Sequence, residues 1–129
     1  MPNVLAIDFD GVIMRRQSGD NLEAADFIRA GYRREMPKRF ALKAETIPGT
    51  AEALSKLADD WTLVLHTCRA RHEWGAESVR EYLRRRQLLN YFESITPIKP
   101  HAAAYIDDHA HRFTTWANVL ESFPGDDDQ

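Results

Sequence analysis

The chain has 129 residues, of which 43% are hydrophobic and 29% are charged, and its formal net charge is −3. This length and composition predict a single globular domain over residues 1–125, with one core and no room for a second. The acidic tail at 126–129 carries three of the negative charges, so the rest of the chain is close to neutral. That balance argues against a dedicated nucleic-acid binder, although it leaves a nucleic-acid partner open.

Cysteine content and the apolar segments predict where the protein resides. Cys68 is the only cysteine in the sequence and cannot form an internal disulfide, which suits a reducing compartment. Asp8 and Asp10 interrupt the first apolar stretch, which therefore does not fit a signal peptide. No segment approaches the roughly 20 apolar residues of a membrane span. We expect a cytoplasmic protein with no membrane partner, and the sequence leaves its oligomeric state open.

The hydrophobic pattern alternates between continuous apolar runs and segments with one apolar face. Continuous runs predict buried parallel strands, and a face repeating every three to four residues predicts helices. In the helix at 50–59, for example, Ala51, Leu54, Leu57 and Ala58 share a face. Such alternation predicts an α/β fold with a parallel sheet and right-handed crossovers. Strands are expected at 3–9, 61–67, 92–96 and 104–107, and helices at 50–59, 74–89 and 113–122.

Two segments do not fit this alternation. Residues 15–46 are too long for an ordinary loop between strand and helix. Because Ala24, Phe27, Ile28 and Gly31 share a helical face, we expect a small flap or helical insertion over the strand ends. The third and fourth strands are separated by roughly seven residues, fewer than a crossover between parallel neighbours needs. Either these strands are not neighbours, or the third is not a strand.

Two carboxylates follow the first strand, at the edge where open α/β sheets bind ligands. An ionised aspartate such as Asp8 can attack phosphorus if a cation screens the incoming phosphate. Mg²⁺ needs only a few oxygen ligands besides water, which Asp8, Asp107 and the carbonyl of Asp10 can supply. The Asp10 carboxyl can exchange protons with the leaving oxygen and with water, and Gly11 lets the backbone approach the substrate. The alternative is a turn that closes the strand, but the buried run before it favours a functional site.

Further candidates follow the other strands. Thr67 can donate to a phosphoryl oxygen; the alternative is a residue that only ends the strand. Arg69 can bind a phosphate or a carboxylate; the alternative is an arginine that lies in solvent. Lys99 lies between two prolines and can hold a phosphate by charge or be a solvated loop lysine. Asp107 and Asp108 repel each other, and a cation is the simplest compensation. Their alternative role is a turn in which Asp108 caps a helix.

The five histidines form no zinc-binding pattern. His109 and His111 are two residues apart and would need further ligands that the sequence does not offer. We therefore expect the histidines at the surface or behind the residues that contact the ligand.

Taken together, four segments resemble, in order, the motifs of the haloacid dehalogenase (HAD) superfamily. They are Ile-Asp-Phe-Asp-Gly-Val at 7–12, Leu-His-Thr at 65–67, Lys-Pro at 99–100 and Tyr-Ile-Asp-Asp at 105–108. The chain is most similar to short, capless phosphatase-like members, in which an aromatic residue and a tryptophan follow the last motif. The resemblance covers residues 4–116 and implies a Rossmann-like three-layer α/β sandwich with a mostly parallel sheet and no large cap.

The resemblance also implies an activity, a magnesium-dependent phosphomonoester hydrolase that forms an aspartyl-phosphate. Its substrate would be a small phosphorylated molecule or an exposed phosphate on a macromolecule. By this resemblance Asp8 is the nucleophile and Asp10 is the general acid and base. Thr67 and Lys99 hold the phosphoryl group, and Gly11 and Arg69 face the substrate. Mg²⁺ is bound by Asp8, Asp10 and Asp107, with Asp108 as an auxiliary ligand.

The sequence departs from the usual HAD pattern at three points. Val12 stands where a threonine is usual, which removes a hydroxyl near the first motif. His109 stands where an arginine is frequent. The spacing between Lys99 and Asp107 is shorter than in larger members.

Two other classes of protein are compatible with these residues. One is a phospho-acceptor signalling module of the response-regulator type, which also groups acidic residues, a threonine and a lysine around magnesium. In such modules the acidic pair comes first and the phosphorylated aspartate ends a middle strand, whereas here that strand ends in Thr67 and the acidic pair comes last. The other is a catalytically silent phosphate-binding protein of the same fold, against which the intact Asp8 and Asp10 argue.

Overall fold

The centre of the molecule is a five-stranded sheet in which every recorded strand pair is parallel. The computed structural model describes residues 3–16, 24–30, 34–107 and 111–124. Within them the strand order is β3-β2-β1-β4-β5, which confirms the predicted α/β class and parallel sheet. The strands are β1 (Val4–Asp8), β2 (Thr62–His66), β3 (Phe92–Thr96), β4 (Ala104–Asp107) and β5 (His111–Arg112).

Helices connect the strands largely as predicted, with differences at their ends. Helix α3 stops before residue 89 because Gln87 adopts a positive φ of 59° and the Leu88 amide donates to the Leu83 carbonyl (2.8 Å). Helix α4 starts later than predicted because the Thr115 hydroxyl caps it, accepting from the Asn118 amide (3.1 Å). The described helices are α1 (Ala24–Ala30), α2 (Thr50–Asp60), α3 (Glu73–Arg85) and α4 (Trp116–Ser122), with the 3-10 helices η1 (Lys38–Phe40), η2 (Cys68–Arg71) and η3 (Leu89–Tyr91).

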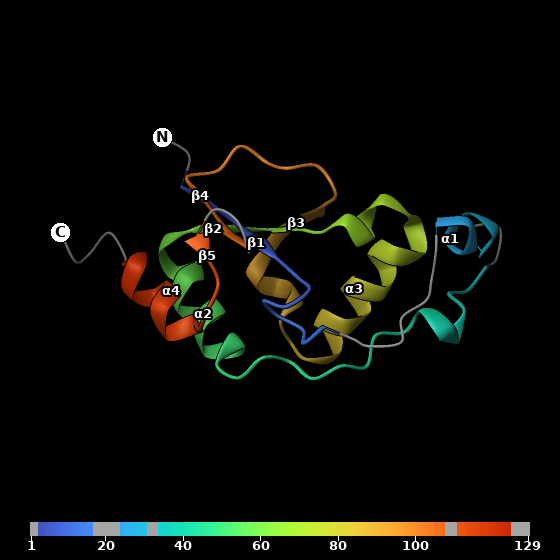
Figure 1. The fold of residues 1–129 in the computed structure, drawn as a ribbon, viewed down its shortest axis with the longest axis horizontal. Coiled ribbons are helices and arrows are strands. Elements are labelled where there is room, and N and C mark those ends of the chain that lie inside the picture. The colour runs from blue at the N-terminus through green and yellow to red at the C-terminus, as the bar shows by residue number, and fades with distance from the viewer. Residues whose placement is uncertain (1–2, 17–23, 31–33, 108–110, 125–129) are drawn as a thin grey trace.

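The main core lies on one face of the sheet. Leu5 and Ile7 of β1 point to this face and are fully buried. Helices α4 and α2 lie side by side against it, and α3 covers it further along, with η3 between α2 and α3 (Figure 1). Helix α2 buries Ala53 rather than the predicted Ala51, which is exposed. Each fully buried Leu or Ile contributes about 1.5–3 kcal/mol. The other buried side chains of this cluster include Leu54, Leu57, Leu63, Leu65, Val79, Leu83 and Val119.

The opposite face of the sheet carries a thinner layer, made by residues 97–103 instead of a helix. This segment crosses the sheet on the side away from α2 and α3 (Figure 1). The Tyr105 hydroxyl donates to the Pro100 carbonyl (2.6 Å), which fixes the segment over β4. It joins β3 to β4, and these two strands are not neighbours because β2 and β1 lie between them. The first of the two alternatives, in which these strands are not neighbours, is therefore confirmed.

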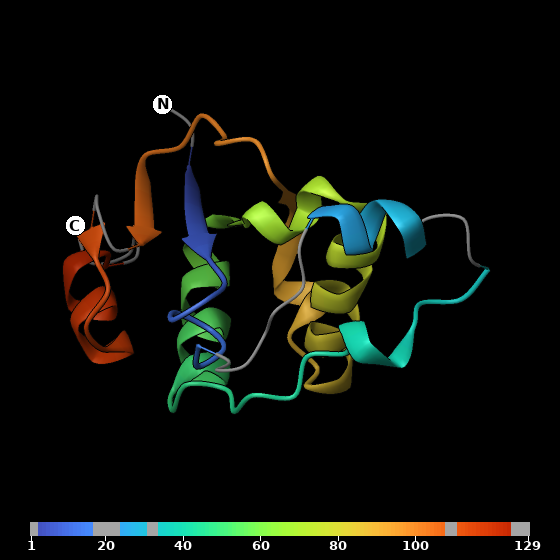
Figure 2. The same cartoon turned by 45° about the vertical axis from the view of Figure 1, so that its right-hand side comes forward.

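Within residues 15–46, α1 and η1 pack against the start of α3. Phe27 and Phe40 stack with their ring centroids 4.7 Å apart, and the Trp74 indole donates to the Ala30 carbonyl (2.5 Å). The predicted face of α1 was partly wrong, because Ile28 is 61% exposed and the buried position is Ala30; Gly31 lies outside the described residues. Figure 2 shows α1 beside α3, on the far side of the molecule from α4.

None of the described helices combines the length and apolar character that a membrane span requires.

Candidate functional site

Asp8 is the last residue of β1 and lies between two other ionisable side chains. The register of the sheet places it opposite His66 of β2. On the other side, Ile7 pairs with Ile106, so Asp107 is the next residue along β4 and points to the same face as Asp8. The Asp8 carboxylate is half-buried and accepts a hydrogen bond from the Phe9 amide (2.8 Å). The end of β1 is therefore the centre of the candidate site.

The pKa of Asp8 is raised above its ordinary value. Burial is the main cause, and the negative charges of Asp10 and Asp107 raise it further, whereas the Phe9 amide and the charge of His66 oppose the shift. Asp10 and Asp107 thus act electrostatically on Asp8. The ionised form of Asp8 is therefore less favourable here than in solvent, and a bound cation would relieve the repulsion.

Asp10 forms an ion pair with Arg69, which follows β2. The Arg69 Nε lies 3.0 Å from Asp10 Oδ2, and its Nη2 lies 2.9 Å from Oδ1. The two side chains are only 19% and 25% exposed, respectively. Of the two roles predicted for Arg69, binding of a phosphate or carboxylate and a position in solvent, the structure shows the first, because the guanidinium binds the carboxylate of Asp10. The pair joins the ends of β1 and β2.

Gly11 makes the turn that follows the two aspartates. Its φ is +79°, a conformation that strains any residue with a Cβ, and its amide donates to the Met14 carbonyl (2.7 Å). A Cβ at this position would also lie 3.3 Å from the Arg16 Nε. Val12, where a threonine is usual in HAD proteins, is 1% exposed and belongs to the main core. This position is a packing position here, and a hydroxyl on it would be buried among apolar side chains.

Thr67 is held at the end of β2 by hydrogen bonds. Its amide donates to the Thr96 carbonyl (3.0 Å), and its hydroxyl oxygen accepts from the Arg69 amide (3.3 Å) at the start of η2. The residue is 2% exposed. Because the hydroxyl acts as an acceptor in this bond, its proton is available for another acceptor.

Lys99 lies on the same face of the sheet as Asp8 but further back along β4. Its ammonium group is 4.3 Å from the centroid of the Tyr105 ring, and Tyr105 pairs with Ala6, two residues before Asp8. Among the residues that the structure describes, the charges that act on Asp8 are those of Asp10, Asp107 and His66, and Lys99 is not one of them. The structure thus brings Asp8, Asp10 and Asp107 together and leaves Lys99 apart. Asp108 and His109 lie outside the described residues.

Two residues of the site were not singled out from the sequence. His66, expected at the surface or behind the ligand contacts, lies directly beside Asp8. Gly75 lies in the first turn of α3, and a Cβ there would be 2.0 Å from the Arg69 carbonyl oxygen. It therefore allows α3 to pack against η2, which carries Arg69. A glycine inside a helical pattern is the signal that could have identified it.

The oxygen ligands near Asp8 suit a hard cation such as Mg²⁺. No group of three or more acidic, histidine or cysteine side chains is arranged to hold a metal in the described parts of the chain. Mg²⁺ keeps several waters and is commonly held by one or two carboxylates. Asp8 and Asp107 would provide these, and the Asp10 carbonyl would add a third oxygen while its carboxylate stays with Arg69.

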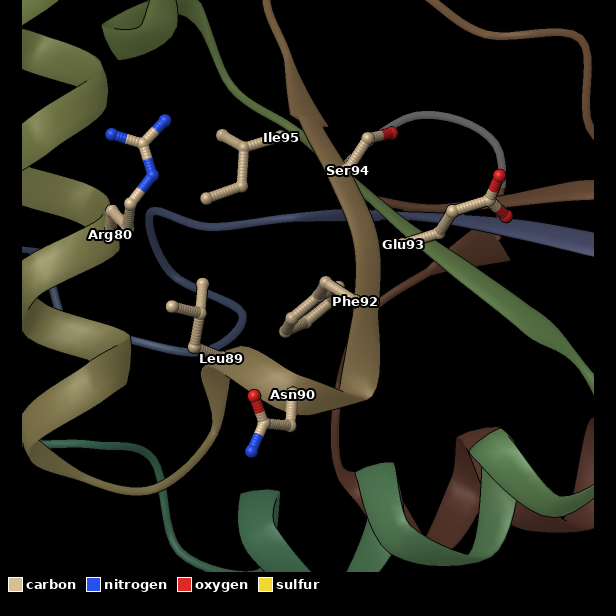
Figure 3. A pocket seen from close by; sticks show the side chains of 7 residues that line it. All are labelled: Arg80, Leu89, Asn90, Phe92, Glu93, Ser94 and Ile95. Atoms are coloured by element: carbon tan, nitrogen blue, oxygen red, sulfur yellow. The ribbon is translucent and has the colours of Figure 1, made fainter.

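Two hollows in the described surface differ in their relation to this site. One lies between α3 and the edge strand β3, where Arg80, Leu89, Phe92 and Ile95 face the same space (Figure 3). It contains none of the candidate site residues. The other lies beside Gly11, between the loop after β1 and the start of α4.

Comparison with known proteins gave one similar structure. No protein family matches the chain, and no curated protein is similar enough to count as a match. Among solved structures, the fold is similar to the crystal structure of a HAD-superfamily hydrolase from Ehrlichia chaffeensis, with a TM-score of 0.45 and 13% sequence identity. The alignment covers 78% of this chain and 65% of that protein, so part of the hydrolase has no counterpart here.

Proposed function

We propose that the protein is a magnesium-dependent phosphomonoester hydrolase that acts through an aspartyl-phosphate. The observation that carries this proposal is the half-buried Asp8 at the end of β1, on which Asp10 and Asp107 act electrostatically. A carboxyl group whose pKa is raised by burial and by neighbouring negative charges is typical of functional sites. Bound Mg²⁺ would neutralise this cluster and screen the phosphate dianion as it approaches.

The residues divide the reaction between them. The Asp8 carboxylate attacks phosphorus, a bond forms between its oxygen and phosphorus, and the bond to the leaving oxygen breaks. Asp10 in its protonated form gives its proton to the leaving oxygen, and the carboxylate that results takes a proton from the water that hydrolyses the aspartyl-phosphate. Thr67 donates its hydroxyl proton to a phosphoryl oxygen; the hydrogen bond that its hydroxyl oxygen accepts from the Arg69 amide leaves this proton available.

Arg69 has two partners in this proposal. In the absence of substrate it holds the Asp10 carboxylate. A phosphoryl group at Asp8 offers the same fork-shaped guanidinium two further oxygen acceptors. Arg69 then helps to bind the phosphoryl group and releases one Asp10 oxygen for proton transfer.

The Arg69–Asp10 pair also favours a second candidate, a phospho-acceptor or silent phosphate-binding protein. If Asp10 stayed fully engaged with Arg69, the aspartyl-phosphate would form but hydrolyse slowly. The two candidates therefore differ in turnover, while phosphate binding at Asp8 is common to both.

The test is hydrolysis of 4-nitrophenyl phosphate by the full chain. We expect turnover with Mg²⁺, none after EDTA, and none in Asp8→Asn, with the exposed Glu93→Gln on β3 as a matched carboxylate-to-amide control. Undiminished activity in Asp8→Asn would show that Asp8 is not the nucleophile. If all phosphates are inert while beryllofluoride still binds in the presence of Mg²⁺, the second candidate is correct.

A further inference from the structure

The hollow beside Gly11 has the size of a small-molecule site. Its volume is about 450 Å³, within the range of about 300–1,000 Å³ that is common for ligand pockets. It begins at Gly11, the residue after Asp10, and extends to Phe113, whose amide donates to the Asp107 carbonyl (3.0 Å). The pocket is therefore next in sequence to Asp10, through Gly11, and is joined to Asp107 by the hydrogen bond of Phe113, although no acidic side chain is among its described lining residues.

Hydrogen bonds fix the walls of this pocket relative to the acidic residues. The Ile47 amide donates to the Ile13 carbonyl (2.8 Å), and the Arg15 amide donates to the Glu45 carbonyl (2.8 Å). These bonds attach one wall to the loop that carries Asp10 and Gly11. The opposite wall follows β5 and is attached to β4 by the Phe113 amide. Both walls of the pocket are thus hydrogen-bonded to segments that carry candidate site residues.

The lining combines apolar faces with a few polar groups. Ile47, Phe113 and Trp116 supply the apolar surface, and the Phe113 and Trp116 rings pack edge to face with centroids 5.2 Å apart. The Trp116 indole N–H already donates to the Thr50 hydroxyl (2.8 Å), so Trp116 presents only its carbon edge. Arg15 and the exposed Thr114 supply polar groups at the pocket. Arg15 makes one long ion pair with Glu45 (3.4 Å) and is 55% exposed.

We propose that this pocket binds the leaving group of the substrate, and that this group carries a flat, hydrogen-bonding ring, as in nucleoside monophosphates. The inference rests on the proposed phosphatase function. A ring fits because Phe113 and Ile47 offer an apolar surface on which it stacks, while Arg15 and Thr114 bind acceptors on its edge or on a sugar. A short aliphatic alcohol would leave the apolar surface unused. The hollow at β3 (Figure 3) does not compete for this role, because it lies at the opposite edge of the sheet.

The first test compares substrates with and without a ring. We expect kcat/KM to be higher for 3′- or 5′-nucleoside monophosphates than for glycerol phosphate. Phe113→Leu keeps an apolar side chain but removes the ring. It should lower kcat/KM for the nucleotide by about tenfold relative to that for acetyl phosphate, which has no ring. An equal effect on both substrates would overturn the proposal. Circular dichroism checks the fold, because Phe113 contacts Trp116.

A matched pair of arginine variants tests the polar side of the pocket. Arg15→Ala should raise KM for nucleotides several-fold relative to acetyl phosphate. Arg39→Ala is the control, because Arg39 is 52% exposed and has one long ion pair (Arg39–Asp26, 3.7 Å) but lies in η1, away from the pocket. If both variants change the nucleotide preference equally, Arg15 has no role in binding.

Binding without turnover separates this inference from the proposed function. Isothermal titration of adenosine into the Asp8→Asn protein needs no catalysis, and Phe113→Leu in the same background should weaken that binding about tenfold. If adenosine binds in this way but no phosphate is hydrolysed, the pocket assignment stands and the phosphatase proposal fails. If phosphates are hydrolysed but adenosine does not bind and nucleotides are not preferred, the pocket assignment fails.

Discussion

Arg69 donates to both carboxylate oxygens of Asp10, through Nε at 3.0 Å and Nη2 at 2.9 Å. The two residues are 59 positions apart in the sequence, and their contact ties the ends of β1 and β2 together. A lysine has no planar fork and can hold only one oxygen well at a time. The planar guanidinium is therefore specifically required for this contact.

Replacement of Arg69 by lysine should lower activity although the charge is kept. A charge-assisted hydrogen bond contributes about 1.5–3 kcal/mol, so the loss of one such bond to Asp10 or to the phosphoryl group should lower kcat/KM about tenfold to a hundredfold. Steady-state kinetics of Arg69→Lys measure this, and Arg71→Lys in the same 3-10 helix, where Arg71 is exposed, is the control. Equal activity of Arg69→Lys and wild type would show that the guanidinium of Arg69 is not needed for catalysis.

Asp8→Asn should make the metal-free protein more stable at neutral pH. The folded protein raises the pKa of Asp8 above its ordinary 3.8, so the ionised side chain destabilises the fold progressively as the pH rises above that value. Asparagine does not ionise, so the melting temperature in EDTA should be higher for Asp8→Asn than for the wild type at pH 7. This gain should vanish below about pH 3.8, where Asp8 is protonated in both states.

Magnesium should reverse this difference. The ion binds the folded state, so it should raise the melting temperature of the wild type more than that of Asp8→Asn. Glu93→Gln, which changes an exposed carboxylate, should leave both measurements unchanged. A wild type that is more stable than Asp8→Asn in EDTA at pH 7 would contradict the electrostatic description of the site.

Gly75→Ala should displace Arg69, although Gly75 itself lies outside the candidate site. A Cβ would lie 2.0 Å from the Arg69 carbonyl oxygen, and this oxygen belongs to a backbone that cannot move without shifting η2. Overpacking of this kind costs about 1–3 kcal/mol, which urea denaturation measures. The activity should fall with the displacement of Arg69. The control is Glu73→Ala, an exposed position in the same helical turn. Unchanged stability and kinetics in Gly75→Ala would show that α3 does not fix Arg69.

The parts of the fold that follow from the sequence are those buried on both faces of the sheet. β1 and β2 read as continuous apolar runs because neither face meets water, and the acidic and hydroxyl residues that end them mark the edge of the site. β5 has two residues and no pattern to detect. The exposure of Ile28 and the burial of Ala30 depend on where η1 and Trp74 lie, which no local periodicity specifies. The position of Lys99 could not be predicted from local periodicity either, because it is set by how residues 97–103 cross the sheet.

Lys99 provides the sharpest test of the resemblance to HAD proteins. Its ammonium group lies over Tyr105. To hold the phosphoryl group, the role that the resemblance implies, it would have to leave that ring. If it does, Lys99→Ala should lower kcat/KM about a hundredfold, the usual effect of removing one group that stabilises the transition state. The free energy of unfolding should change by no more than about 1 kcal/mol, because an exposed cation–π contact contributes little. Tyr105→Leu removes the ring but keeps the lysine, so this variant should retain its activity whereas Lys99→Ala should lose it. Wild-type kinetics in Lys99→Ala would mean that Lys99 only packs on Tyr105 and that the phosphoryl group is held by Thr67 and Arg69.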